Sequence, residues 1–322
     1  MTAERWHGIH ENGAARDLSG GVRLRLSGPD AVRYLNGQVT NDVRKIPHGG
    51  SLPACVTNHR GRLEALVMLS RDTDGALFIA SGEEDLRDFL PLRLEKYLIA
   101  DNCVLEDLTE STALVHVLTA DAGRVAADLV PGERRADCRR FGVPGTDIWT
   151  TPDRVDFWLG KYTPLASEEA RTLEVIHGVP AWGHELSPDI LPPEAGLDRT
   201  AIDFHKGCYI GQEVISRIRS VGRVNRHLEA ITQVSGAEPV QAGWNLFQPT
   251  EPGNEETAGR PSAAAGTVTS AADHPVTGAR HLLGFVRRTA AASGTRLLAG
   301  PGTVLEAASA TAPAAVEIMK DS

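Results

Sequence analysis

The chain has 322 residues, 41% of them hydrophobic and 23% charged, which is an ordinary globular composition with length for roughly two or three domains. Its 42 acidic and 33 basic side chains give a formal net charge of -9, so a general electrostatic affinity for nucleic acid or anionic lipid is not expected. No apolar run approaches the roughly 18 residues that span a bilayer, and residues 1–20 contain no signal-peptide core. We therefore expect a cytoplasmic protein without nucleic-acid or membrane partners.

Periodic patterns define the elements of the N-terminal part. Residues 22–26 alternate apolar and polar side chains as a half-buried strand does, and Gly28-Pro29-Asp30 then ends that strand. The turn signal Asp72-Thr73-Asp74-Gly75 separates two apolar runs and indicates a hairpin. In chain order we expect a strand at 22–26, a short helix at 31–36, hairpin strands at 63–69 and 76–80, and a helix at 83–99 that Pro91 kinks or restarts.

The pattern of elements changes after Gly222. Before it, strands are expected at 104–108 and 114–118 and helices at 122–129 and 167–177, the last closed by Gly178. After it, short strand-like pieces separated by turn residues indicate a small all-β module. The mixture indicates an α+β protein rather than regular βαβ repetition. We expect an α+β region at residues 1–221 and a separate β domain at 222–322.

Common catalytic motifs are missing from the sequence. There is no G-x-G-x-x-G, P-loop, G-x-S-x-G or H-E-x-x-H, so dinucleotide, P-loop, serine-hydrolase and zincin functions lose their main support. The four cysteines are unclustered and show neither zinc-site nor disulfide spacing, so each is a single thiol.

The densest local signal is KGCYIGQE, residues 206–213. Gly207 and Gly211 allow a tight turn or a close approach of the backbone, and the residues that follow can begin a helix. Cys208 would then lie beside a helix N-terminus and near Lys206, and both favour the thiolate over the thiol. A partly exposed Cys208 would be nucleophilic and redox-active. Alternatively, Cys208 is a buried small hydrophobic residue in a glycine-rich turn.

Two upstream carboxylates and one downstream arginine are further candidates. Glu185 and Glu194 lie in Pro- and Gly-rich loops, where an ionised carboxylate can accept two parallel hydrogen bonds from a guanidine-like ligand edge, or act only as a cap or a solvated group. Arg217 begins a basic cluster that suits a carboxylated or phosphorylated ligand, or the solvent face of a strand. His205 and Cys208 do not define four convergent metal ligands, so no metal site is expected.

These motifs resemble one family over nearly the whole chain, the YgfZ branch of folate-binding proteins, which is similar to the T-protein (aminomethyltransferase) of the glycine cleavage system. Residues 26–31 and 35–43 resemble the N-terminal signature of the family. Residues 178–185 and 193–197 resemble the central segment of the superfamily. The eight residues 206–213 match the K-G-C-Y-x-G-Q-E signature of the YgfZ branch.

The resemblance implies a T-protein-like, three-lobed α+β ring with a central folate pocket and a small C-terminal β-barrel. It implies a role in the assembly or repair of iron-sulfur clusters in client enzymes, with Cys208 as the functional thiol and Lys206 beside it. Tetrahydrofolate or a one-carbon derivative is the expected cofactor, and iron-sulfur client or assembly proteins are the expected partners. The residues assigned to folate binding are Asn41, Asp42, Glu64, Glu185, Glu194, Tyr209, Gln212, Glu213 and Arg217.

Two segments depart from the T-protein pattern. Glu64 stands where the T-protein has the first Asp of a G-G-x-L-D-D-type segment, and the extra methylene moves its carboxylate by more than about 1 Å. Where the T-protein has a pterin-binding Glu, this chain offers Thr146, or Asp147 with a shift. Two alternatives to the iron-sulfur role stay open: an aminomethyltransferase or demethylase that uses Glu64 and passes a one-carbon unit to tetrahydrofolate, and a folate-binding scaffold without catalysis.

Overall fold

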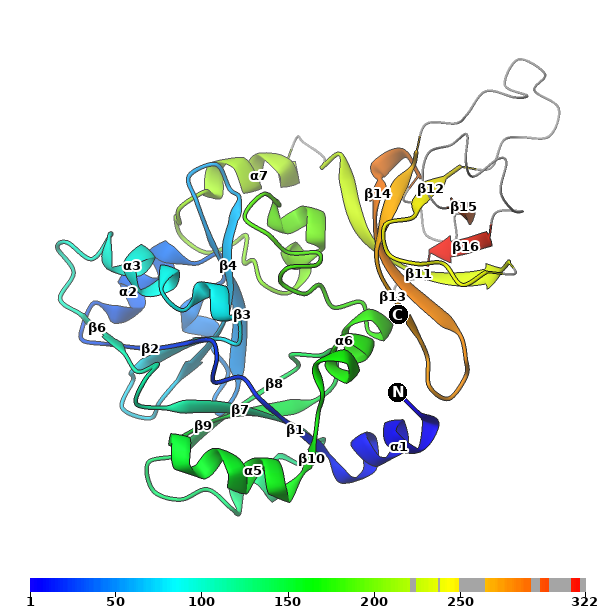
Figure 1. Cartoon of the computed structure of the whole chain (residues 1–322). Helices are drawn as coiled ribbons and strands as arrows, with labels where there is room; N and C mark the ends of the chain where they lie inside the picture. Colours follow the sequence, from blue (N-terminus) through cyan, green and yellow to red (C-terminus); the bar gives the residue numbers. More distant parts are fainter. Residues whose placement is uncertain (221–223, 237, 249–263, 291–295, 301–313, 319–322) are drawn as a thin grey trace.

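The computed structural model describes residues 1–220, 224–236, 238–248, 264–290, 296–300 and 314–318. Figure 1 shows two β-sheets and a β-barrel, with helix α6 (Ser167–Ile176) between the second sheet and the barrel. The expected α+β mixture is thereby confirmed. Within the described ranges, no helix is both long enough and apolar enough to cross a bilayer.

The first sheet is antiparallel and has the strand order β3-β4-β5-β2-β6. The predicted hairpin is formed by β4 and β5, and its Asp72 and Gly75 close the turn with a backbone hydrogen bond. The strands are β2 (Val22–Ser27), β3 (Ser51–Thr57), β4 (Leu63–Arg71), β5 (Leu77–Ser81) and β6 (Val104–Asp107).

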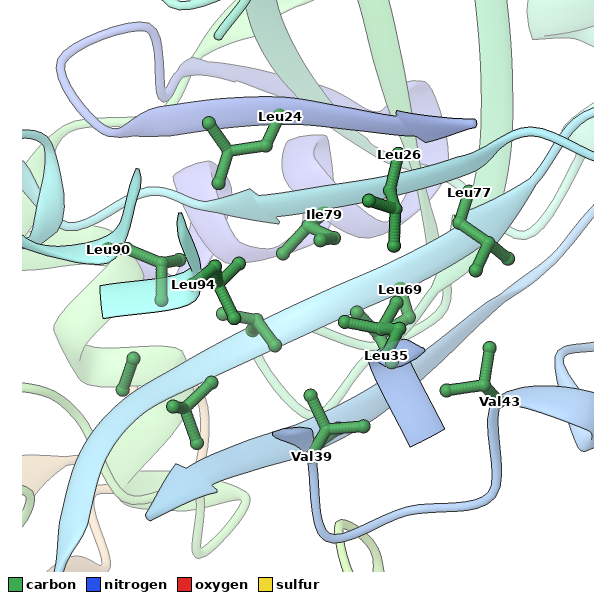
Figure 2. Packing of buried hydrophobic residues seen from close by; sticks show 14 of the residues in the cluster. Leu24, Leu26, Leu35, Val39, Val43, Leu69, Leu77, Ile79, Leu90 and Leu94 are labelled. Atoms are coloured by element: carbon green, nitrogen blue, oxygen red, sulfur yellow. The ribbon is translucent and has the colours of Figure 1, made fainter. Parts of the chain in front are cut away.

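Two helices pack on this sheet, α2 (Ala31–Gln38) and α3 (Phe89–Glu95). Their leucines meet alternate residues of the strands in a buried core (Figure 2). The helix predicted at 83–99 is interrupted, as expected, but earlier than Pro91: a 3-10 turn at Glu84–Leu86 precedes α3, which begins at Phe89. Pro91 lies in the first turn of α3, where its missing N–H removes no intrahelical hydrogen bond.

The second sheet has the order β10-β1-β7-β9-β8, and only β1 and β10 run parallel. Helix α5 (Val155–Lys161) packs on it and buries Trp158 against Val115 and Ile148. The strands are β1 (Ala14–Asp17), β7 (Ala113–Leu118), β8 (Arg134–Cys138), β9 (Gly145–Thr150) and β10 (Thr163–Pro164), and the small helices are α1 (Ala3–Asn12) and α4 (Ala122–Ala126).

The C-terminal strands form the β-rich module that the sequence predicts. Their pairing order is β11-β14-β13-β12-β15-β16 and returns to β11, so the sheet closes on itself. The strands are β11 (Arg226–Ser235), β12 (Asn245–Phe247), β13 (Gly266–Asp273), β14 (Arg280–Arg287), β15 (Arg296–Gly300) and β16 (Ala314–Ile318). The boundary expected at 221/222 falls in residues 221–223, which lie outside the described ranges.

The segment between α6 and the barrel links all three parts. It contains the 3-10 turns η4 (Pro192–Ala195) and η5 (Leu197–Arg199) and ends in α7 (Gln212–Ser220). Leu186, Ile190 and Leu197 of this segment pack against Cys55 and Leu63 of the first sheet. Residues 206–213 follow in the same segment and contact β3, where the Thr57 hydroxyl donates to the Ile210 carbonyl.

Candidate functional site

The KGCYIGQE motif packs on the end of α2 and on the β3–β4 hairpin. The Ile210 amide donates to the Gly37 carbonyl (3.2 Å), and the Thr57 hydroxyl donates to the Ile210 carbonyl (2.6 Å). Helix α7 begins at Gln212, as predicted. Two elements that are distant in sequence, α2 and the β3–β4 hairpin, therefore hold this turn.

Within the turn, the thiol and the phenol have opposite environments. Cys208 is exposed, so the interpretation of this cysteine as a buried hydrophobic residue is wrong. Tyr209 is buried with Ile202 and Ile215, and burial raises the pKa of its hydroxyl. No hydrogen-bond partner for that hydroxyl is found among the described residues. Cys208 is thus the accessible nucleophile of the motif, and Tyr209 anchors the turn.

Lys206 lies beneath the turn and is buried. Its Nζ donates to the carbonyl oxygens of Asn36 (2.5 Å), Val39 (2.6 Å) and Asn41 (2.9 Å). Burial lowers the pKa of Lys206 to about 8, although the nearby Asp42 opposes this shift. An ammonium has three donors, and all three are occupied by backbone oxygens at the C-terminal end of α2. This geometry gives Lys206 a structural role and leaves no donor for the Cys208 sulfur.

Asn41 and Asp42 are buried at the same junction. The Asn41 Nδ2 donates to the carbonyls of Pro53 (2.9 Å) and Thr200 (3.1 Å). The Asp42 carboxylate accepts from Arg44, which lowers the pKa of that carboxyl. Asn41 connects the end of α2 to β3 and the central segment, whereas Asp42 caps the 3-10 turn that follows it. Their assignment to folate binding stays a prediction.

Gly211 is required by the way this motif packs. Its φ is +87°, in the left-handed region, and an added Cβ would lie 2.5 Å from the Asn58 carbonyl oxygen. We expect Gly211→Ala to lower the free energy of unfolding by about 2–4 kcal/mol. The matched control is Gly207→Ala, because no atom lies within 4 Å of a Cβ added there, and a change below about 0.5 kcal/mol is expected. Urea unfolding of both variants checks this, and equal losses would contradict it.

The first turns of α7 contain the remaining residues of the motif. Gln212 is the first helical residue, and Glu213 forms an exposed ion pair with Arg217 (3.0 Å) one turn later. Such an exposed i,i+4 pair contributes only about 0.3–0.5 kcal/mol. Glu213 and Arg217 therefore remain free to contact a partner.

The two loop carboxylates have protein partners. The Glu185 side chain is buried and accepts from Arg171 (2.6 and 2.8 Å), Thr269 (2.8 Å), Ser270 (2.6 Å) and the Ala181 amide (3.0 Å). These bonds occupy the roughly four lone-pair sites of a carboxylate. Glu194 accepts from the Leu191 amide and pairs with Arg226. Both glutamates connect the central segment to its surroundings, and Glu185 joins α6 to the barrel.

A cavity of about 110 Å³ lies between the two sheets and the segment that follows α6. Its apolar walls include Leu66 and Met68 of β4 and the rings of Phe141 and Trp182. Its charged groups are Glu83, Glu174 and Arg140. The cavity therefore combines aromatic rings with carboxylates, which is typical of a site for a flat, polar heterocycle.

The two carboxyls in this cavity have altered acidity. Burial raises the pKa of Glu174 to about 7, and the ion pair with Arg171 (3.1 Å) only partly offsets this. Burial also raises the pKa of Glu83, while Arg140 acts in the opposite direction. Glu174 thus changes its protonation state near neutral pH. Such shifts concentrate at functional sites, although structural groups also show them. Sequence reasoning missed both residues, because no local pattern marks them.

Glu64 lies at a β-bulge in β4 and is bound by α3. Ala65 pairs with Val56 and Leu63 pairs with Thr57, so Glu64 is the extra residue of the bulge, where the alternation of side chains is interrupted. Leu63 packs with Leu66, whereas the Glu64 carboxylate accepts from the Arg93 Nε of α3 (2.6 Å). Glu64 is not among the residues that line the cavity, and its assignment to folate binding stays a prediction.

Thr146 and Asp147, the proposed replacements for a pterin-binding Glu, are bonded inside the second sheet. Asp147 is buried and accepts from Arg140 (2.7 Å) and the His116 Nδ1 (2.8 Å), and Arg140 lowers the pKa of Asp147 against the effect of burial. The ligand atoms of His116, Cys138 and Asp147 lie within 4.8 Å of one another. Because the Arg140 cation already neutralises the carboxylate, this cluster is a buried hydrogen-bond network that disfavours a metal ion.

Comparisons with known proteins give relatives and a fold. No family model matches the chain. It is 26% identical over 238 residues to the tRNA-modifying protein YgfZ of Klebsiella pneumoniae, which covers 69% of this chain and 72% of that protein. It is 28% identical over 209 residues to a mitochondrial iron-sulfur cluster assembly factor IBA57 homologue of Pyricularia oryzae, covering 64% and 54% of the two chains.

The fold match is broader than the sequence matches. The crystal structure of the glycine cleavage system aminomethyltransferase T from Bartonella henselae superposes with a TM-score of 0.81 at 17% identity, covering 98% of this chain and 88% of that one. These findings confirm the resemblance to YgfZ-type proteins and show that the chain has the fold of the T-protein.

Proposed function

We propose that this chain, a relative of YgfZ-type proteins with the T-protein fold, binds tetrahydrofolate or a one-carbon derivative and acts in the assembly or repair of iron-sulfur clusters in client proteins. The observation that supports folate binding most directly is the central cavity, where Glu174 and Glu83 lie beside two aromatic rings. In this proposal the two sheets and the barrel are the three lobes of a ring, and the domain boundary lies near residue 221.

The chemistry of the cavity fits the pterin end of a folate. The amino-pyrimidine edge of a pterin presents parallel N–H donors, which one carboxylate can accept in a bidentate fashion. Glu174 is the best-placed acceptor, and the rings of Phe141 and Trp182 flank the space. At about 110 Å³ the cavity is smaller than the roughly 300 Å³ usual for a drug-sized ligand, so only the ring system is enclosed and the glutamate tail lies outside.

The thiol is assigned to the iron-sulfur step. Iron-sulfur clusters are held by cysteine thiolates, and Cys208 is the cysteine with an exposed side chain among the four. The names of the relatives include both tRNA modification and iron-sulfur assembly. We favour iron-sulfur assembly, because a net charge of -9 opposes direct binding of tRNA. Cys208 then contacts the client or assembly protein, with Glu213 and Arg217 beside it.

The test separates the pocket from the thiol. We expect Cys208→Ala to abolish support of an iron-sulfur client enzyme while tetrahydrofolate binding changes less than twofold, because the exposed sulfur does not line the cavity. Calorimetric titration with tetrahydrofolate and its formyl derivative measures binding, and client activity in cells lacking the native protein measures function. Cys103→Ala is the control thiol change.

Two results would contradict the proposal. Absence of binding at millimolar tetrahydrofolate or formyl derivative would exclude a folate pocket. Full client activity in Cys208→Ala would exclude the thiol step. A folate-binding scaffold and an aminomethyltransferase both predict that result. No feature of the described residues favours the transferase, since the Glu64 carboxylate is bound by Arg93.

A further inference from the structure

The segment from α3 to β6 of the first sheet carries exposed apolar side chains, and none of them is among the residues that line the cavity. Five of the ten large hydrophobic side chains that are exposed in the described ranges fall in a stretch of 16 residues. We call this surface the α3–β6 patch; it consists of Phe89, Leu92, Tyr97, Ile99 and Val104. Ile99 is 87% exposed and Leu92 is 68% exposed, so these residues contribute nothing to the core. An apolar cluster of this kind marks an interaction site more often than singly scattered residues do.

The backbone beside the patch is an open sheet edge. Helix α3 contacts β6, and Figure 1 shows both at the end of the first sheet remote from the barrel. Strand β6 pairs with β2, and no other strand in the described part of the chain pairs with it. The Leu108 amide, just after β6, donates to the Arg23 carbonyl of β2. Because the backbone N–H and C=O groups of successive residues point to opposite sides of a strand, those of Leu105 and Asp107 point away from β2. An unpaired edge is a template for an added strand.

The charges around the patch are acidic. Six carboxylates of residues 84–110 are exposed, while Lys96 is the one exposed base of that range. These acidic residues are Glu84, Asp85, Asp88, Glu95, Asp107 and Glu110. Glu110 is paired with Arg87, and no partner is shown for Glu84, Asp85 or Glu95. The rim therefore attracts cations and repels nucleic acid and anionic lipid.

We propose that the α3–β6 patch docks an extended segment of a partner protein that alternates apolar and basic side chains. The segment adds a strand to β6 through the outward backbone groups of Leu105 and Asp107. Its apolar side chains cover Leu92 and Ile99, and its Lys or Arg side chains meet the acidic rim. Strand addition supplies affinity from main-chain hydrogen bonds, and the alternate side chains supply specificity. This docking is independent of the cavity and of Cys208.

The probe is a short peptide that alternates valine with lysine, and its matched control alternates valine with glutamate. We expect saturable binding of the lysine peptide, at least tenfold weaker binding of the glutamate peptide, and weakening as salt is raised. The double variant Leu92→Ser/Ile99→Ser removes two exposed side chains, keeps the fold, and is expected to lose at least tenfold in affinity. Val276→Ser, which changes an exposed valine on the barrel, is expected to bind as the native chain does.

Hydrogen exchange gives a second, independent measurement. The amides of Leu105 and Asp107 are expected to become protected when the lysine peptide binds, while tetrahydrofolate affinity stays unchanged. Equal binding of both peptides, or no protection at β6, would overturn the proposal. A concentration-dependent dimer that Leu92→Ser/Ile99→Ser abolishes would also overturn it, since the patch would then be a self-interface.

Discussion

Replacing Lys206 with methionine is expected to lower the free energy of unfolding by about 3 kcal/mol or more. Methionine keeps most of the volume of the buried chain but removes the ammonium that serves the carbonyls of Asn36, Val39 and Asn41. Those oxygens lie where α2 ends, so they lose hydrogen bonds and the favourable charge at the negative end of the helix. Urea unfolding at neutral pH measures the loss.

The matched control for this substitution is Lys45→Met. Lys45 is mostly exposed and pairs with Asp203 at the surface, so its loss is expected to cost less than about 1 kcal/mol. The rate at which Cys208 reacts with a small disulfide reagent, measured in the native folded state, is the second readout. A Lys206→Met variant with native stability and a much slower thiol would contradict the structural role and restore the sequence-based expectation that Lys206 activates Cys208.

The local features of the KGCYIGQE motif were predictable because they depend on neighbours in sequence. Gly211 has the conformation that favours glycine, and Gln212 begins the helix that follows. The strand at 22–26, the hairpin turn at 72–75 and the helix closed by Gly178 follow from the same kind of local pattern. The exposure of Cys208 was not fixed by the sequence, since a glycine-rich turn is compatible with either environment.

Groups whose environment depends on distant segments could not be predicted. Glu185 lies in a Pro- and Gly-rich loop, where a carboxylate is expected to be available to a ligand. Arg171 and the barrel residues Thr269 and Ser270 nevertheless donate hydrogen bonds to its carboxylate. Conversely, Glu174 looks like an ordinary solvated helix residue, and only the position of α6 between the second sheet and the barrel places it in the wall of the cavity. Tertiary contacts therefore make Glu174 a better candidate than Glu185 for contacting a ligand, which is the reverse of what the sequence suggests.

Substituting Glu174 with glutamine is expected to weaken tetrahydrofolate binding by roughly 30- to 150-fold, which corresponds to about 2–3 kcal/mol for losing charge-assisted hydrogen bonds. The neutral amide cannot accept two parallel N–H groups from a pterin edge, although its shape is nearly that of glutamate. Titration calorimetry at pH 8 measures the change. Glu168→Gln, an exposed change on the same helix, is the matched control and is expected to bind normally.

The pH dependence distinguishes binding by Glu174 from a general effect on the fold. Because the folded-state pKa is raised to about 7, the carboxyl stabilises the fold fully below its ordinary value, and that contribution is lost as pH rises through 7. Glu174→Gln should therefore match the native chain in stability at pH 4 and exceed it by about 1–3 kcal/mol at pH 8. Folate affinity should move in the opposite direction, since only the ionised carboxylate accepts both N–H groups. We expect the native chain to bind tetrahydrofolate more strongly at pH 8 than at pH 6, and Glu174→Gln to show no such trend. A trend shared by both proteins would exclude Glu174 as the acceptor.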